Sequence, residues 1–75
     1  MNTHTLDSLP IGKSAKIRSL TSNNLERRRM LDFGLIPGSQ ITAVYKSPLG
    51  NPTAYLIKGT VIALRNEDAR KILID

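Results

Sequence analysis

The sequence contains no cysteine and no tryptophan, and its other aromatic residues are one histidine, two tyrosines and one phenylalanine. The absence of cysteine excludes disulfides, thiolate metal sites and thiol catalysis. Hydrophobic residues make up 40% of the chain, but they form no run long enough to cross a membrane. The N-terminus also lacks the basic-then-apolar pattern of a signal peptide. We therefore expect a soluble, cytoplasmic protein.

Groups suited to catalysis are also scarce. The chain has six acidic residues, scattered along its length, and its one histidine, His4, lies close to the N-terminus. The segment Gly12-Lys13-Ser14 resembles the end of a phosphate-binding loop, but Asp7 occupies the position of the first glycine of that motif. We therefore expect a binding module without a cofactor rather than an enzyme.

The length and the hydrophobic pattern indicate one small domain over residues 1–75, with a flexible segment at 1–8. A domain of this size buries only about 60% of its unfolded surface, so most of its apolar residues are needed for the core. Period-two alternation is typical of half-buried strands. The predicted fold is mostly β, a closed or nearly closed five-stranded barrel with one helix inserted between strands 1 and 2. The strands are expected at 14–20, 41–46, 53–58, 61–65 and 71–74, and a single helical turn at 67–70.

The local sequence marks both ends of the one predicted helix, over 24–33. Asn23 is a good N-cap, and Glu26 follows it at the spacing of a capping box. Gly34 stands where a left-handed residue ends many helices, and Pro37 prevents the helix from continuing. The helix should therefore begin just after Asn23 and end just before Gly34.

A step of about 100° per residue assigns the helix residues to faces. Leu25, Met30 and Phe33 are predicted to share a face that packs on the barrel. Arg28 is predicted to point outwards and to pair with Asp32 four residues on.

The helix also carries the densest positive charge in a chain of net charge +5. Arg27 and Arg28 are the predicted contacts with an acidic partner surface, and Leu31 is predicted to be an exposed apolar contact beside them. The alternatives are a solvated helix face for the arginines and packing at the edge of the core for Leu31.

Leu49 is the fourth predicted partner contact. It lies in the loop 47–52, which is rich in proline, glycine and polar residues. Loops on a rigid scaffold often carry recognition residues. The alternative is that Leu49 folds back and covers one end of the barrel.

Four segments, in this order and at this spacing, resemble the FeoA family. The chain has LPIG at 9–12, RRMLDFGLIPG at 28–38, SPLGNP at 47–52 and IALR at 62–65, followed by NEDA at 66–69. Phe33 stands where Leu or Met is usual in the family, and the triple arginine is more basic than the pattern requires. The resemblance extends over nearly the whole chain.

The resemblance implies an SH3-like barrel that serves as a small cytoplasmic accessory of bacterial ferrous iron uptake. The implied partner is FeoB, a membrane permease with a cytoplasmic GTPase domain, so the protein would meet the membrane only through that partner. The expected function is to bind FeoB on its cytoplasmic side and to modulate it.

Three other functions remain open from the residues. A basic surface could bind nucleic acid, although stacking aromatic residues are scarce and we expect no such partner. Glu67 and Asp68, or His4, could sense or carry Fe²⁺ directly. An SH3-like groove could bind peptides, although its usual aromatic lining is thin here.

Overall fold

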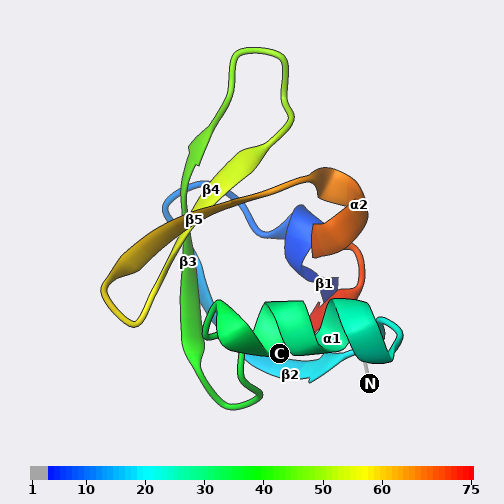
Figure 1. Ribbon diagram of the computed structural model, residues 1–75. Coiled ribbons are helices and arrows are strands. Elements are labelled where there is room, and N and C mark those ends of the chain that lie inside the picture. The colour runs from blue at the N-terminus through cyan, green and yellow to red at the C-terminus, as the bar shows by residue number, and fades with distance from the viewer. Residues whose placement is uncertain (1–3) are drawn as a thin grey trace.

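The computed structural model describes residues 4–75, which form one antiparallel sheet with a longer and a shorter helix (Figure 1). The strands lie in the order β1-β6-β2-β3-β4-β5. The elements in chain order are β1 (His4–Thr5), a 3-10 turn η1 (Leu6–Ser8), β2 (Ser14–Leu20), α1 (Asn24–Asp32), β3 (Gln40–Lys46), β4 (Thr53–Ile57), β5 (Thr60–Leu64), α2 (Asn66–Ala69) and β6 (Ile72–Ile74).

The sheet has six strands and two edges, so the prediction of a closed or nearly closed five-stranded barrel is wrong in strand number, and the sheet is not closed. Within residues 4–75, no ladder joins β1 to β5, and these two strands are the edges. The helix α1 lies between the segments predicted as strands 1 and 2, but the additional strand β1 makes them the second and third strands, β2 and β3. Closure depends on how the twist accumulates across the whole sheet, and local alternation in the sequence does not encode this property.

The additional strand is β1, in the segment predicted to be flexible. His4 and Thr5 pair with Ile74 and Leu73 of β6, close to the other end of the chain. In η1, Leu6 is completely buried. The expectation of a flexible segment therefore does not hold for residues 4–8, while residues 1–3 lie outside the described part. Local sequence patterns do not predict this pairing, because β1 and β6 lie close to opposite ends of the chain.

The core lies inside the curved sheet, and α1 closes one side of it. Burial raises the pKa of the Tyr55 phenol, against the opposing effect of its hydrogen bond with Thr53. The largest fully buried side chains come from η1, from four strands and from a residue three positions after the end of α1. They are Leu6, Ile17, Leu35, Ile41, Tyr55, Ile57 and Ile72.

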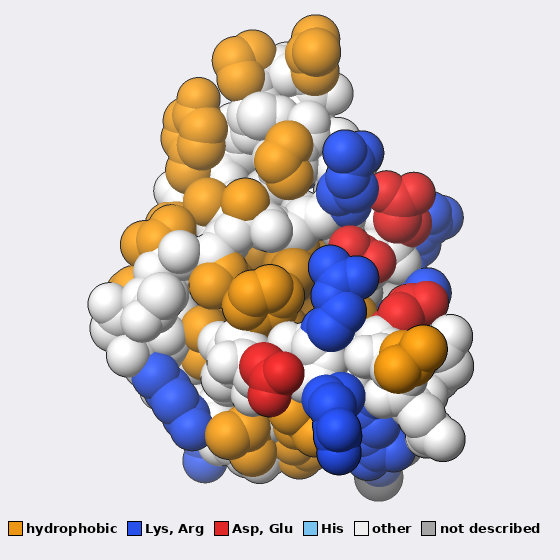
Figure 2. Space-filling model, in the orientation of Figure 1, with side chains coloured by type: hydrophobic (Ala, Val, Ile, Leu, Met, Phe, Trp, Pro, Cys, Tyr) orange, Lys and Arg blue, Asp and Glu red, His pale blue; other side chains and the backbone are white. Residues whose placement is uncertain are grey.

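The hairpin formed by β3 and β4 projects from one end of the molecule, and α1 crosses the other end (Figure 1). In the same orientation, apolar side chains gather over the projecting hairpin, while lysine and arginine side chains gather over α1 (Figure 2). The two predicted contact regions, α1 and the loop 47–52, are thus at opposite ends of the molecule.

A candidate protein-binding surface on α1

Both ends of α1 are fixed by the local interactions that the sequence predicted. At the start, the Asn23 side chain accepts a hydrogen bond from the Glu26 backbone N–H at 3.0 Å. At the end, Gly34 has a φ of +92°, and its N–H donates to the Leu31 carbonyl at 2.9 Å. The next N–H, that of Leu35, donates to the Met30 carbonyl at 3.0 Å. This pair of bonds is a Schellman motif. The Asn23 cap and this motif together confirm the two predicted ends.

Two residues that the Schellman motif joins mark the side of α1 that faces the core. Met30 and Leu35, whose backbones it joins, are both buried in the core cluster. On the same side, the Lys71 ammonium donates to the Glu26 carboxylate at 2.6 Å. This hydrogen bond raises the pKa of Lys71. The inner side of α1 is therefore held by apolar packing in its middle and by an ion pair near its start.

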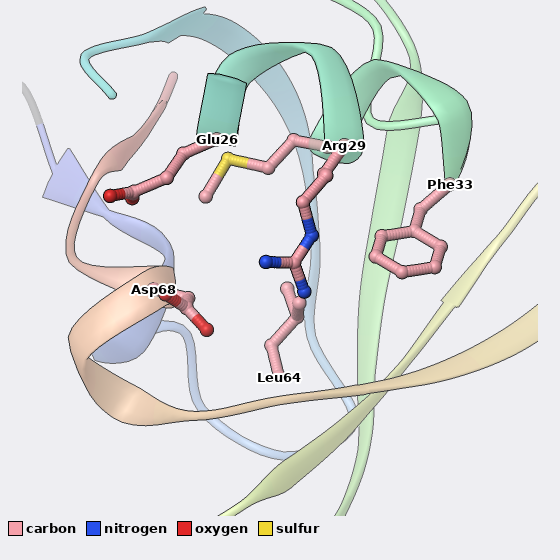
Figure 3. A pocket seen from close by; sticks show the side chains of 6 residues that line it. Glu26, Arg29, Phe33, Leu64 and Asp68 are labelled. Carbon is pink, nitrogen blue, oxygen red and sulfur yellow. The ribbon is translucent and has the colours of Figure 1, made fainter. Parts of the chain in front are cut away.

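A small pocket lies between the inner side of α1 and the segment from β5 to α2 (Figure 3). Its volume is about 50 Å³, well below the roughly 300 Å³ at which small-molecule sites begin. Figure 3 shows the Arg29 guanidinium extending from α1 between Phe33 and Asp68. The pocket is therefore too small for a nucleotide or a similar substrate.

The outer side of α1 is an open hollow that carries three of the four predicted contact residues. Arg27, Arg28 and Leu31 line it together with Leu25 and Asn24. Leu25 is 80% exposed and Leu31 is 39% exposed. We refer to Leu25, Arg27, Arg28 and Leu31 as the α1 patch. It combines two exposed leucines with two arginines on one face of a fixed helix.

The prediction that Leu25, Met30 and Phe33 share a packed face is wrong for Leu25 and holds only in part for Phe33. Met30 is buried, Phe33 is 50% exposed at the pocket, and Leu25 is exposed on the other side of the helix. At about 100° per residue, Leu25 and Met30 are about 140° apart, so they cannot both face the core. The sequence gives the angle between Leu25 and Met30 on the helix, but it does not show which of the two faces the core.

The expected ion pair between Arg28 and Asp32 is also absent from the described part of the chain, where the ion pair formed by α1 is that of Glu26 with Lys71. Arg28 lines the outer hollow instead. Its positive charge is thus not paired with an acidic residue of α1.

Leu49 stands apart from the α1 patch, at the tip of the β3–β4 hairpin. It is 94% exposed, so the alternative that it folds back over the barrel is excluded. The loop is held directly after Leu49, because the Asn66 side-chain amide donates to the Gly50 carbonyl at 3.2 Å. The Asn66 backbone N–H also donates to the Asn51 side chain at 3.1 Å. Leu49 is therefore presented to solvent by a loop that is tied to α2.

Neither a metal centre nor a membrane helix is found in the described chain. Over residues 4–75, no three side chains of His, Cys, Asp or Glu converge on a point where they could hold a metal ion. Asp68 lines the small pocket beside α1, and His4 is exposed on β1. Neither of the two described helices has the length and apolar character needed to span a bilayer.

The family model that matches the chain is that of the FeoA domain, over residues 4–75. The chain belongs to the FeoA family. Over 70 residues it is 36% identical to a fusion of Fe(2+) transport protein A with the Fe(2+) transporter FeoB from Porphyromonas gingivalis. The match covers 93% of this chain but only 8% of that relative. FeoA is a family of ferrous iron transport, and in this relative the FeoA and FeoB parts share one polypeptide.

Two solved FeoA structures have the same fold. The FeoA of Stenotrophomonas maltophilia, solved in complex with zinc, is 30% identical with a TM-score of 0.84, and the match covers 96% of this chain and 89% of that one. It is described as a prokaryotic SH3 domain protein and a candidate activating factor for ferrous iron transport. The FeoA of Chlorobium tepidum is 28% identical with a TM-score of 0.88, over 95% of this chain and 68% of that one. The SH3-like part of the predicted fold is thus supported within the family.

Proposed function

We propose that this FeoA protein is a cytoplasmic accessory that binds a FeoB-like ferrous iron transporter through the α1 patch and modulates it. The observation that carries the proposal is the exposure of Leu25 and Leu31 beside Arg27 and Arg28 on a helix fixed at both ends. Apolar side chains that the fold does not bury can anchor a partner, and arginines at the rim speed the encounter. The fusion of FeoA to FeoB in P. gingivalis supports this choice of partner.

Leu49 serves in this proposal as a second, separate contact. The β3–β4 hairpin projects away from α1 (Figure 1), so one flat surface cannot cover both α1 and the hairpin tip. A partner that touches both must either reach around the molecule or use two elements. The α1 patch is therefore the primary site, and Leu49 is a contact that a larger partner reaches.

Modulation of the transporter requires different affinities for its states. A ligand shifts a conformational equilibrium only by its differential affinity for the two conformations. We propose that the α1 patch prefers one nucleotide state of the transporter's cytoplasmic GTPase domain. The FeoA chain then biases the transporter without moving iron or hydrolysing GTP itself.

The test is an NMR titration of the isotope-labelled protein with the isolated GTPase domain of the cognate transporter, with GDP and with a non-hydrolysable GTP analogue. We expect the amide shifts to cluster on Leu25 to Leu31 and to be stronger in one nucleotide state. Shifts around Leu49 alone would make the hairpin tip the site, and no shifts in either state would remove the GTPase domain as the docking partner.

A further inference from the structure

β5 is an edge strand that offers free backbone hydrogen-bonding groups. It pairs with β4 on one side, and no other strand in residues 4–75 pairs with it on the other side. Lys58 and Gly59, which join β4 to β5, have φ values of +50° and +77°, as in a two-residue type I′ turn. In such a hairpin, Ile57 and Thr60 form the hydrogen-bonded closing pair.

The register then shows which groups remain free. Hydrogen-bonded and non-hydrogen-bonded pairs alternate along an antiparallel ladder. Ile62 and Leu64 therefore bond to β4, as Thr60 does, through their register partners Tyr55 and Thr53. The N–H and C=O groups of Val61 and Ala63 point away from β4. Four backbone groups thus line the open edge of β5.

The side chains along this edge are apolar and exposed. Val61 is 61% exposed and lies opposite Leu56, which is 38% exposed. Ala63, also exposed, lies opposite Ala54. Proteins usually protect an edge strand with a charge, a proline or a bulge, but Thr60–Leu64 has the sequence TVIAL and its register with β4 is unbroken. The strand is therefore open to the addition of another strand.

The charges at its two ends indicate what kind of strand would fit. Lys58 precedes β5 and Arg65 follows it; both are exposed, and neither forms an ion pair in the described residues. A second copy added antiparallel about Ile62 would place its Arg65 opposite Gly59 of the first copy and next to Lys58. Like charges across a strand pair are destabilising. A strand with an acidic residue at each end would instead meet a cation at each end.

We propose that the β5 edge is a second interaction surface, which binds an extended protein segment with apolar residues at alternate positions and an acidic residue at each end. The segment adds as a further strand, bonding to the backbone of Val61 and Ala63 and packing against Val61 and Leu56. This mode of recognition takes its affinity from main-chain hydrogen bonds and its specificity from side chains at alternate positions. The proposal goes beyond the α1 patch and does not depend on the identity of the transporter.

The first test is an NMR titration of the full chain with the peptide DTVTVTD, capped at both ends, and with KTVTVTK as its matched control. We expect the largest amide shifts at Val61 and Ala63, and we expect affinity for the acidic peptide to be about tenfold higher than for the basic one. Equal affinity for the two peptides, or shifts scattered over the surface, would overturn the proposal. A dilution series without peptide is run alongside, because shifts at Val61 that depend on protein concentration would assign the edge to a second copy instead.

The second test removes one free N–H group from the edge. Ala63→Pro deletes a donor that faces away from β4, which a proline at an edge position tolerates, whereas Ala63→Thr keeps the donor. We expect Ala63→Pro to weaken binding of DTVTVTD about fivefold and Ala63→Thr to leave it unchanged. If Ala63→Pro does not fold, hydrogen exchange of the wild-type chain decides, because bound peptide must slow exchange of the Val61 and Ala63 amides. Unslowed exchange at both amides under saturating peptide would contradict strand addition.

Discussion

The inner and outer sides of α1 each combine apolar with charged residues, but the two sides have different roles. The inner side contributes Met30, buried against the core, and Glu26, paired with Lys71. The outer side contributes Leu25 and Leu31, which the fold leaves exposed. An apolar residue that the fold does not bury adds little to stability, so its contribution is sought in binding. The comparison predicts that changes on the inner side alter stability and that changes on the outer side alter binding.

The largest effect is expected at Met30. Met30→Ala should lower the free energy of unfolding by about 2–5 kcal/mol, because it leaves a cavity under α1. Leu25→Ala is the matched control from the other side of the helix, and its change should stay within about 0.5 kcal/mol. Urea unfolding monitored by circular dichroism measures both variants. A loss of stability in Leu25→Ala as large as that in Met30→Ala would show that the two sides do not differ.

A smaller effect is expected at the cap that positions both sides. Asn23→Ala removes the acceptor for the Glu26 N–H and should lower the unfolding free energy by about 1 kcal/mol. The neighbouring Asn24 lies inside the helix and caps nothing, so Asn24→Ala should leave stability unchanged or raise it slightly. Thermal unfolding of the two variants separates these outcomes, and equal destabilisation by both would argue against the cap.

The smallest effect is expected at the ion pair of Lys71 with Glu26, because it is partly exposed and salt screens it. The raised pKa of Lys71 means that the folded chain holds this proton more tightly than the unfolded chain. The stabilisation is therefore complete below the ordinary pKa of lysine and is lost as the pH rises through the folded-state pKa. The difference in stability between the wild-type chain and Glu26→Gln should accordingly shrink as the pH rises above about 10.4. A difference that stays constant through this range would contradict the assignment.

Features set by local sequence were predicted well, and features set by distant contacts were not. Asn23 and Gly34 define the ends of α1 through bonds to residues three to five positions away. β1, in contrast, exists because it pairs with β6 at the other end of the chain. The loop that carries Leu49 is likewise tied to α2 by Asn66, which lies 16 positions from Gly50 in the sequence. The absence of charge and of proline from 60–64 could be read from the sequence, but that β5 is an edge required the sheet order.

Among the contacts on α1, the sequence predicted the two arginines and Leu31 but not Leu25. Arg27, Arg28 and Leu31 were singled out and do line one hollow, together with Leu25. Leu25 was assigned to the core because helical geometry gives relative angles between residues and not the direction of the core. Only the burial of Met30 and Leu35 fixes that direction.

The central claim, that the α1 patch is the docking surface for the transporter, is tested most directly by one affinity comparison. The binding of the wild-type chain, Arg28→Glu and Arg70→Glu to the full-length cognate transporter in nanodiscs would be measured at the same salt concentration. Arg70 is exposed beyond α2, so its variant makes the same change in net charge away from the patch. The account predicts at least about a tenfold loss of affinity for Arg28→Glu and little change for Arg70→Glu. An equal loss of affinity in both variants would show that net charge, and not the α1 patch, governs binding. Wild-type affinity in Arg28→Glu would contradict the assignment of the patch.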